Sequence, residues 1–374
     1  MPRLATLRNF TFGIASLGFL ASCQVTGGTG TSDASVTRSG PAPSVSLLSF
    51  NGLGNCQVGL KGVPAPWLLI DPKEEYYGAT SDPMSKSLDG YADAVGRLAA
   101  AAFRSDAAKE QLRSAIIGWA RSNAMQWPSG WNNGPDSGPA TVFFTTHTMV
   151  PVAVAYGEHR ELFSLEEQAV VESWMKRLVD RTGNNEQMSR WSVDNKGYLW
   201  ASFAMTYGII AEDQSYVRRA TRIYQGAIRA MRSDGSLPND SGRGGSAIHY
   251  TNKAIASLVL TAELAAGQGV DLYGYSSGGK TIHTAIDFLL RATQQPSLIA
   301  GYAAEVTGAS FRGFDANNQK VDWVRTPSAS WGLFYAKRFP QMATTQQLRR
   351  VSSYVRSPRA EVDAPSAGVA RCLA

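Results

Sequence analysis

The sequence is poor in cysteine and histidine and has no long apolar run, and each scarcity excludes a class of protein. Its 374 residues contain three cysteines and four histidines, too few for a disulfide scaffold or an all-cysteine metal site. No apolar run reaches the ~20 residues that a stable membrane-spanning helix needs. No histidine belongs to an HExxH motif or adjoins a cysteine pair, so we expect neither a metal nor another cofactor.

The charge balance is mildly basic. The formal net charge is +6, with 18% charged residues and 44% hydrophobic residues, which is the composition of an ordinary globular chain. A modest positive charge favours an anionic partner. Nucleic acid is not expected, because the lysines and arginines form no dense cluster.

The first residues have the composition of an export signal. Arg3 and Arg8 precede the apolar stretch 10–20, which leads to Leu-Ala-Ser before Cys23. This pattern predicts a signal peptide over residues 1–22, and it resembles the lipobox of bacterial lipoproteins. The resemblance implies a lipid anchor at Cys23 and a periplasmic protein held at the outer membrane. A plain signal peptide with an incidental cysteine is the alternative.

A tether and one folded domain are expected after the signal. Fourteen of the residues 24–45 are Gly, Ser, Thr or Pro, a composition that cannot bury a core, so we assign residues 23–45 to a flexible tether. Residues 46–374 then form the domain, which we expect to be a monomer. In an oxidising compartment a disulfide between Cys56 and Cys372 is favoured over two separate thiols.

The pattern from about residue 88 onward is helical. Ser164 and Glu167 form a capping box, and apolar residues recur with helical spacing over 171–178 and 217–231. Long Gly- and Trp-rich connections separate the segments, namely 126–138, 182–196, 233–246 and 267–279. Loops of this length are usually functional. We therefore predict an all-α fold, an incomplete α/α toroid of antiparallel helix pairs whose long loops build a groove on one face.

Three separated stretches in the middle of the chain carry a family resemblance. They are Asp194-Asn-Lys-Gly-Tyr198, Gly235-Ser-Leu-Pro238 and His249-Tyr-Thr-Asn252, and Arg243 precedes Tyr250 by seven residues. In order, spacing and identity they resemble the alginate lyase family, helical-toroid polysaccharide lyases that include poly-mannuronate lyase. Lys73 and Tyr77 resemble the family's lid segment. One position departs from the family, because Lys196 stands where the family has a histidine.

The resemblance implies a metal-independent β-elimination on an anionic polysaccharide. A lyase removes the C5 proton of a uronate and expels the C4 oxygen, which requires that the neighbouring carboxylate be neutralised. Asn195 and Arg243 are assigned to that task, with Lys196 assisting. Tyr250 is assigned as general acid and also as base. One residue suffices only where the proton and the leaving oxygen share a face of the ring, so a mannuronan or glucuronan-like polymer is expected.

Other side chains are candidates for contacting the substrate. Aromatic rings in the long loops can stack on sugars, and histidines beside the groove can bind them or, for His147, replace the missing base. His249 points about 100° away from Tyr250 on a helix, which favours packing. The substrate-binding candidates are Lys73, Tyr77, Trp131, His147, Trp191, Tyr198 and His249.

Three rival functions remain open at this point, and one of them, a structural envelope protein, would show no affinity for glycans. A glycoside hydrolase needs two carboxylates across a groove, and Asp194, Asp234, Asp240 and Glu186 lie in or near the long loops, although each suits a cap, a turn or a solvated charge. A non-catalytic glycan-binding lipoprotein would keep the cationic groove without turnover, and the lysine at position 196 is compatible with that alternative.

Overall fold

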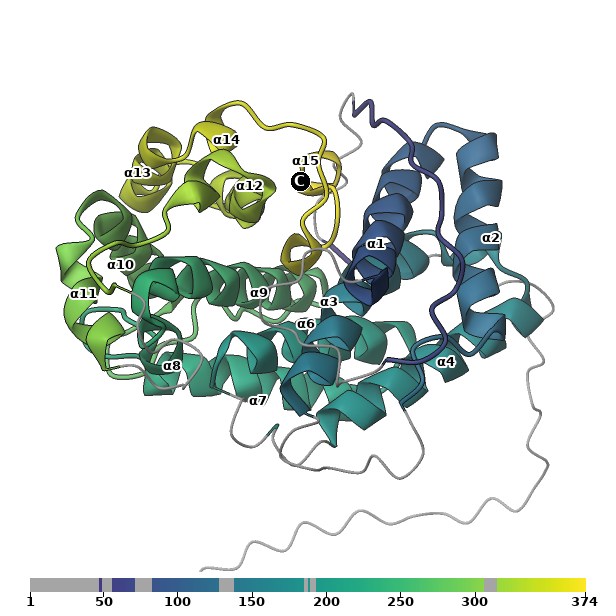
Figure 1. The fold of residues 1–374 in the computed structure, drawn as a ribbon, viewed down its shortest axis with the longest axis horizontal. Helices are drawn as coiled ribbons and strands as arrows, with labels where there is room; N and C mark the ends of the chain where they lie inside the picture. Colours follow the sequence, from purple (N-terminus) through teal and green to yellow (C-terminus); the bar gives the residue numbers. More distant parts are fainter. Residues whose placement is uncertain are drawn as a thin grey trace, which may run out of the picture. The chain divides into compact units, whose positions relative to one another are not determined.

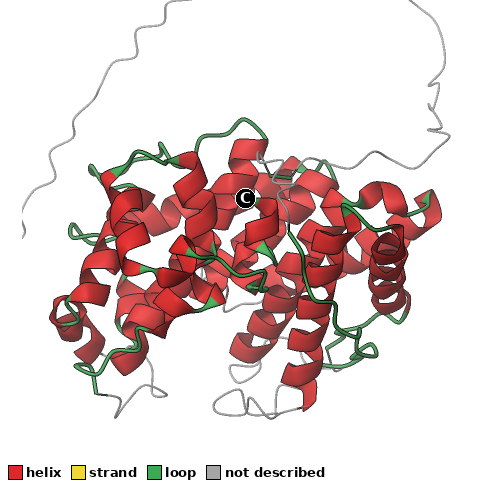
Figure 2. Cartoon of the chain, turned by 90° about the horizontal axis from the view of Figure 1, so that it is seen from above, coloured by secondary structure: helices red, strands yellow, loops and turns green. Residues whose placement is uncertain are grey.

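Helices make up all the regular secondary structure that the computed structural model describes (Figure 2). The described residues are 47–48, 56–70, 83–127, 138–184, 188, 193–305 and 315–374. Within these ranges β-structure is limited to isolated bridges, such as Leu69 with Gln126. The predicted all-α class is therefore confirmed.

The helices follow one another along the chain with few interruptions (Figure 1). The α-helices are α1 (Pro83–Ala102), α2 (Asp106–Arg121), α3 (Gly138–Glu158), α4 (Leu165–Gly183), α6 (Asn195–Ile210), α7 (Gln214–Ala230), α8 (Pro238–Ser241), α9 (Ala247–Gly267), α10 (Ile282–Gln294), α11 (Ser297–Ala304), α12 (Trp331–Arg338), α13 (Ala343–Val351), α14 (Ser353–Arg356) and α15 (Ala370–Leu373). Short 3-10 turns are η1 (Arg160–Leu162), η2 (Gly244–Ser246), η4 (Asp322–Arg325), η5 (Pro327–Ala329) and η6 (Ala364–Ser366).

The long helices are arranged in pairs that form two layers. The inner helices α1, α3, α6, α9 and α12 each pack against the next one in that series, and each also packs against the helix that follows it in the chain, namely α2, α4, α7, α10 and α13. All residues of α6 are buried, whereas α7 buries one face only, as expected for an inner and an outer helix. This arrangement is the predicted series of helix pairs.

The connections place the amino ends of the inner helices at one end of the layer. Short connections join α1 to α2 and α6 to α7, and consecutive helices joined in this way run antiparallel. The longer connections that precede α3, α6 and α9 then return the chain to the starting end. The loop 267–279 differs from the prediction, because it begins at the carboxyl end of α9, about 30 Å from the amino end of that helix.

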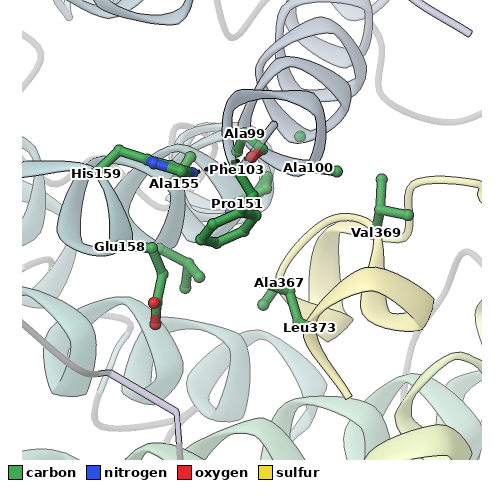
Figure 3. Close-up of a pocket in the computed structure, with 12 residues that line it drawn as sticks. Ala99, Ala100, Phe103, Pro151, Ala155, Glu158, His159, Ala367, Val369 and Leu373 are labelled. Carbon is green, nitrogen blue, oxygen red and sulfur yellow. Dashed lines mark hydrogen bonds between the residues drawn. The ribbon is translucent and has the colours of Figure 1, made fainter. Parts of the chain in front are cut away.

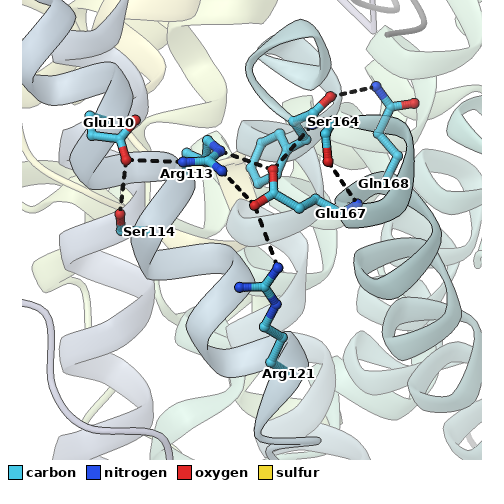
Figure 4. A network of polar contacts seen from close by, with 8 residues as sticks. Glu110, Arg113, Ser114, Arg121, Ser164, Glu167 and Gln168 are labelled. Carbon is cyan, nitrogen blue, oxygen red and sulfur yellow. Dashed lines mark hydrogen bonds and ion pairs between the residues drawn. The ribbon is translucent and has the colours of Figure 1, made fainter. Parts of the chain in front are cut away.

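Local sequence signals explain several helix boundaries. The capping box of Ser164 and Glu167 begins α4 as predicted. The Glu167 carboxylate also accepts hydrogen bonds from Arg113 at 2.6 and 2.9 Å, which joins α2 to α4 (Figure 4). Because the Glu167 side chain is almost fully buried, it depends on this partner.

The carboxyl-terminal segment packs back onto the first helices of the series. A Cβ added to Gly96 of α1 would lie 3.1 Å from Val362 and 3.4 Å from the Gly368 backbone, so the two segments are in close contact. Cys56 forms the disulfide with Cys372 that the sequence favoured, with 5.4 Å between their Cα atoms. A small cavity beside this contact, lined by α1, α3 and the carboxyl-terminal residues (Figure 3), measures about 10 Å³, room for about one water molecule and not for a sugar.

Residues 40–374 constitute one compact unit. None of the helices described within it has both the length and the apolar character of a membrane span.

Candidate active site at the amino ends of α6 and α9

The first turn of α6 is fixed by an aspartate cap. Asp194 is the N-cap, and its Oδ1 accepts hydrogen bonds from the backbone N–H groups of Lys196 and Gly197 at 3.0 and 3.3 Å. Asn195 is therefore the first residue of the helix. Aspartate takes the cap position because its carboxylate also neutralises the positive end of the helix dipole.

The same carboxylate holds two of the predicted catalytic cations. Oδ2 of Asp194 lies 3.2 Å from Nη2 of Arg243 and 3.7 Å from Nζ of Lys196. Nε of Arg243 also donates to the Asn239 carbonyl at 3.0 Å. All three charged side chains are nearly or largely buried, so their geometry is constrained from several sides.

Tyr250 lies beside this cluster at the start of α9. The guanidinium carbon of Arg243 is 5.2 Å from the centroid of the Tyr250 ring, within the range of a cation–π contact. The chain of contacts therefore runs from Lys196 through Asp194 and Arg243 to Tyr250. The four residues predicted to carry catalysis, Asn195 included, are neighbours in the structure.

A second carboxyl group, that of Asp240 on α8, contacts the backbone of Asn195. Its side chain is fully buried, and its Oδ1 accepts the backbone N–H of Asn195 at 3.0 Å. Burial and the nearby charge of Asp194 raise the pKa of Asp240 to about 8. Among the described residues, Oδ2 of Asp240, Oδ1 of Asn195 and the hydroxyl of Tyr198 lack hydrogen-bond partners.

Tyr198 does not reach the surface of the site. Its side chain is 0% exposed, and burial together with the charges of Asp240 and Asp194 raises the pKa of its hydroxyl well above the usual value. A side chain in this position cannot contact a polysaccharide, so the predicted substrate contact is corrected. The reason is that Tyr198 follows the cap by one helical turn and points into the inner layer.

The two predicted histidines lie on inner helices. His147 belongs to α3, and its Nδ1 is 3.5 Å from Oδ1 of Asp89 while its ring stacks on Phe143. His249 is partly buried next to Tyr250, and burial lowers the pKa of its imidazole to about 4, so it is neutral near pH 7. The candidates Lys73, Tyr77, Trp131 and Trp191 lie outside the described residues.

The carboxylates suggested for a hydrolase have other partners. Asp194 caps α6 and binds two cations, and Asp234 accepts hydrogen bonds from Ser236 and Tyr302. Glu186 lies outside the described residues. Within the described ranges, no group of three His, Cys, Asp or Glu side chains could hold a metal ion.

Sequence reasoning did not identify the roles of two aspartates in this site. Asp194 was considered as a hydrolase carboxylate or as a cap, and it is the cap of α6, but its contact with two cations was not expected. Asp240 gave no sequence signal for burial, because a short polar helix is normally exposed.

Known proteins resemble the chain over most of its length. A polysaccharide lyase of Stenotrophomonas maltophilia is 28% identical over 67% of this chain and 72% of its own length. An alginate lyase of Pseudomonas syringae pv. syringae is 27% identical over 40% of each chain. The crystal structure of alginate lyase A1-III from Sphingomonas species A1 superimposes with a TM-score of 0.62 and 19% identity, covering 88% of this chain and 89% of that one.

The fold and the relatives define the class first. The chain has the α/α toroid fold and is a polysaccharide lyase. The model of the alginate lyase family matches residues 71–299, more than half of the chain, and the chain belongs to that family.

Proposed function

We propose that this protein cleaves a mannuronan or glucuronan-like polymer by β-elimination, with Tyr250 as general acid and base. The observation that carries the proposal is the contact series from Lys196 through Asp194 and Arg243 to the Tyr250 ring. It places two cations and a phenol in one cluster at the amino ends of two inner helices. The relatives named alginate lyase, and the A1-III variants complexed with tetrasaccharide, support an alginate-like substrate.

The charge of the cluster suits a uronate. With Asp240 neutral below its pKa of about 8, Arg243 and Lys196 face one carboxylate, Asp194, so the cluster carries a net charge of about one positive unit. The cations neutralise a uronate carboxylate bound there, so its negative charge no longer opposes the carbanion that develops at C5. The Asn195 amide adds a hydrogen-bond donor to the same group.

One tyrosine carries out both proton transfers of the proposed reaction. The deprotonated Tyr250 oxygen takes the proton from C5, the C4–O4 bond breaks as the C4–C5 double bond forms, and the same phenol returns the proton to O4. This sequence requires the proton and O4 to lie on one face of the sugar ring, as in mannuronate and glucuronate. On guluronate they lie on opposite faces and a second base is needed.

The lysine at position 196 is compatible with this chemistry. The family that the chain resembles has a histidine at this position, which is assigned as a base or as a group that positions the substrate. Lys196 is held 3.7 Å from Asp194, a placement that supports a role in binding the carboxylate rather than in accepting a proton. A same-face elimination does not need a further base.

The proposal includes an exported and lipid-anchored location. The signal-like residues 1–22 and Cys23 suggest it, and the Cys56–Cys372 disulfide supports an oxidising compartment. Palmitate labelling of the expressed chain and of a Cys23→Ala variant tests the anchor.

The experiment that tests the activity is ultraviolet absorbance during incubation with poly-mannuronate, poly-guluronate, glucuronan and a pectic polymer. Elimination creates a C4–C5 double bond conjugated with the carboxylate, which absorbs, whereas hydrolysis creates none. We expect absorbance to rise on poly-mannuronate or glucuronan, and the rate to fall at least ~1,000-fold in Tyr250→Phe.

Other outcomes identify the alternatives. New reducing ends without absorbance would indicate a hydrolase. Binding without either signal would indicate a glycan-binding protein. A rise on poly-guluronate alone would contradict the one-tyrosine mechanism and point to a second base.

A further inference from the structure

A second cationic group lies one helical turn beyond Tyr250. Lys253 and Tyr250 are three residues apart on α9, so they share a face of the helix. The intervening Asn252 points elsewhere, because its side chain bonds the Ser328 carbonyl and the Trp331 indole. Lys253 therefore extends the face that carries Tyr250 deeper along the inner layer.

Lys253 is partly buried without an ion-pair partner among the described residues. Burial lowers the pKa of its ammonium group. The charges of Asp363, Asp89 and Asp322 raise that pKa, although none of these three forms an ion pair with Lys253. Its Nζ lies 5.6 Å from the centroid of the Phe143 ring. Buried cations usually have a close anionic partner, whereas none of the ion pairs between described residues involves Lys253, so its ammonium group can pair with an external anion.

The neighbouring helix α3 supplies the complementary groups. Phe143 contacts both Lys253 and His147, with ring centroids 5.0 Å apart in the second pair. Asp89 of α1 lies 3.5 Å from Nδ1 of His147 and thereby orients the imidazole. A row of cation, aromatic ring and imidazole therefore connects α9 to α3 beside Tyr250.

We propose that Lys253, Phe143 and His147 form a second uronate subsite next to the reacting one. In it Lys253 pairs with the carboxylate, Phe143 offers its ring to the sugar face and His147 hydrogen-bonds a hydroxyl group. This inference rests on the proposed function, since it assigns a neighbouring sugar of the same polymer. The row matches an acidic sugar because a charged group and an aromatic face lie side by side.

The test measures binding without turnover. In a Tyr250→Phe background, the affinity for a β-1,4-linked mannuronate tetramer is compared by calorimetry with and without Lys253→Met. The expected loss is about tenfold or more, because a charge-assisted contact is removed. Lys253→Arg keeps the charge and is expected to bind within about threefold of the parent.

Two controls separate charge recognition from general damage. Lys109→Met removes an exposed lysine of the outer helix α2 that pairs with Asp106, and its affinity is expected to be unchanged. A tetramer whose carboxylates are reduced to alcohols should bind the parent weakly, and Lys253→Met should then cause no further loss. Thermal unfolding of each variant identifies any that is misfolded, and Lys253→Arg then decides.

The outcomes distinguish this proposal from the preceding one. Equal tetramer affinity in Lys253→Met and the parent would overturn the subsite, even if the enzyme is an active lyase. An equal effect of Lys253→Met on the charged and reduced tetramers would overturn it as well. If no polymer yields ultraviolet absorbance but binding still depends on Lys253 and on the carboxylates, the subsite stands and the proposed lyase activity fails.

Discussion

At the scale of single residues, the site depends on two aspartates with opposite properties. Asp194 accepts hydrogen bonds from the helix start and faces Arg243 and Lys196, so its negative charge is used several times. Asp240 is fully buried and accepts one backbone N–H, and burial raises its pKa from 3.8 to about 8. Asp194 positions the two cations, whereas Asp240 is neutral below its pKa and therefore leaves the cluster with a net positive charge.

The raised pKa of Asp240 predicts a pH-dependent affinity. Ionisation above about pH 8 adds a negative charge behind Asn195 and cancels the net positive charge of the cluster. We therefore expect the KM for an anionic polymer to rise as the pH increases through that value. In Asp240→Asn, which has nearly the same shape and no charge, this rise should be absent, and activity at lower pH should stay within about threefold.

The same variant has a predicted effect on stability. Between pH 3.8 and about 8 the folded chain holds a proton on Asp240 that the unfolded chain releases. The free energy of unfolding therefore declines as the pH rises across that window, and Asp240→Asn should remove that part of the decline. Urea unfolding and KM, each measured from about pH 4 to about pH 10, check both effects. A KM rise that persists in Asp240→Asn would assign it to another group.

The sequence predicted much of this residue-scale arrangement, but not its support. Asn195, Arg243 and Tyr250 were found through spacing, since family motifs record which residues chemistry requires. Tyr198 was placed incorrectly because adjacency in the chain does not show which way a helical side chain points. Lys253 was missed although its three-residue spacing from Tyr250 was readable, because a single lysine on a helix is normally solvated.

At the scale of elements, the turn before α8 positions the site. Gly235 has φ +98, and a Cβ there would lie 2.3 Å from the Thr284 carbonyl oxygen of α10. An L side chain is therefore excluded by both conformation and space. Because α8 follows this turn and carries Asp240, a shift of the turn would move the group that supports Asn195.

Gly235→Ala is consequently expected to damage both stability and activity. The strain should lower the free energy of unfolding by about 2–4 kcal/mol, and kcat/KM should fall by at least about tenfold. Gly226→Ala is the matched control, since its Cβ would meet only Arg229 at 3.9 Å on the exposed side of α7; it should be neutral or stabilising by up to about 1 kcal/mol. Urea unfolding and polymer kinetics measure both. Equal stability in the two variants would show that the backbone of the turn adjusts to an L side chain without strain.

Helix positions were predictable because amphipathic spacing and caps are local signals, as α4 and α7 illustrate. The inner helix α6 has almost no amphipathic pattern, since it is buried on every side, so its place in the inner layer followed only from its neighbours. The loop 267–279 was assigned to the groove face on its length alone. Its position at the opposite end depends on the direction of α9, which spacing does not record.

At the scale of the whole folded unit, the two ends of the domain meet beside α1. The disulfide joins Cys56 to Cys372 across a sequence separation of 316 residues, and the segment before Cys372 packs on Gly96 of α1. Asp363 belongs to that segment, and its carboxylate interacts electrostatically with Lys253 and His147. The segment that the disulfide joins to the amino-terminal end of the domain therefore also contributes a carboxyl group near the proposed subsite.

This link makes the disulfide a determinant of both stability and binding. Replacing both cysteines by serine should lower the free energy of unfolding by about 2–5 kcal/mol, because a long loop is no longer closed in the unfolded chain. The released segment should also strengthen binding of the mannuronate tetramer in the Tyr250→Phe background by a fewfold, because the Asp363 carboxyl group, which competes with the uronate for Lys253, loses its fixed position. Reduction of the parent with dithiothreitol should reproduce both changes, and it should leave the double serine variant unaffected. A stability loss without any change in affinity would show that the carboxyl-terminal segment keeps its place through packing on α1 and α3 alone, and that the disulfide acts only on the unfolded chain.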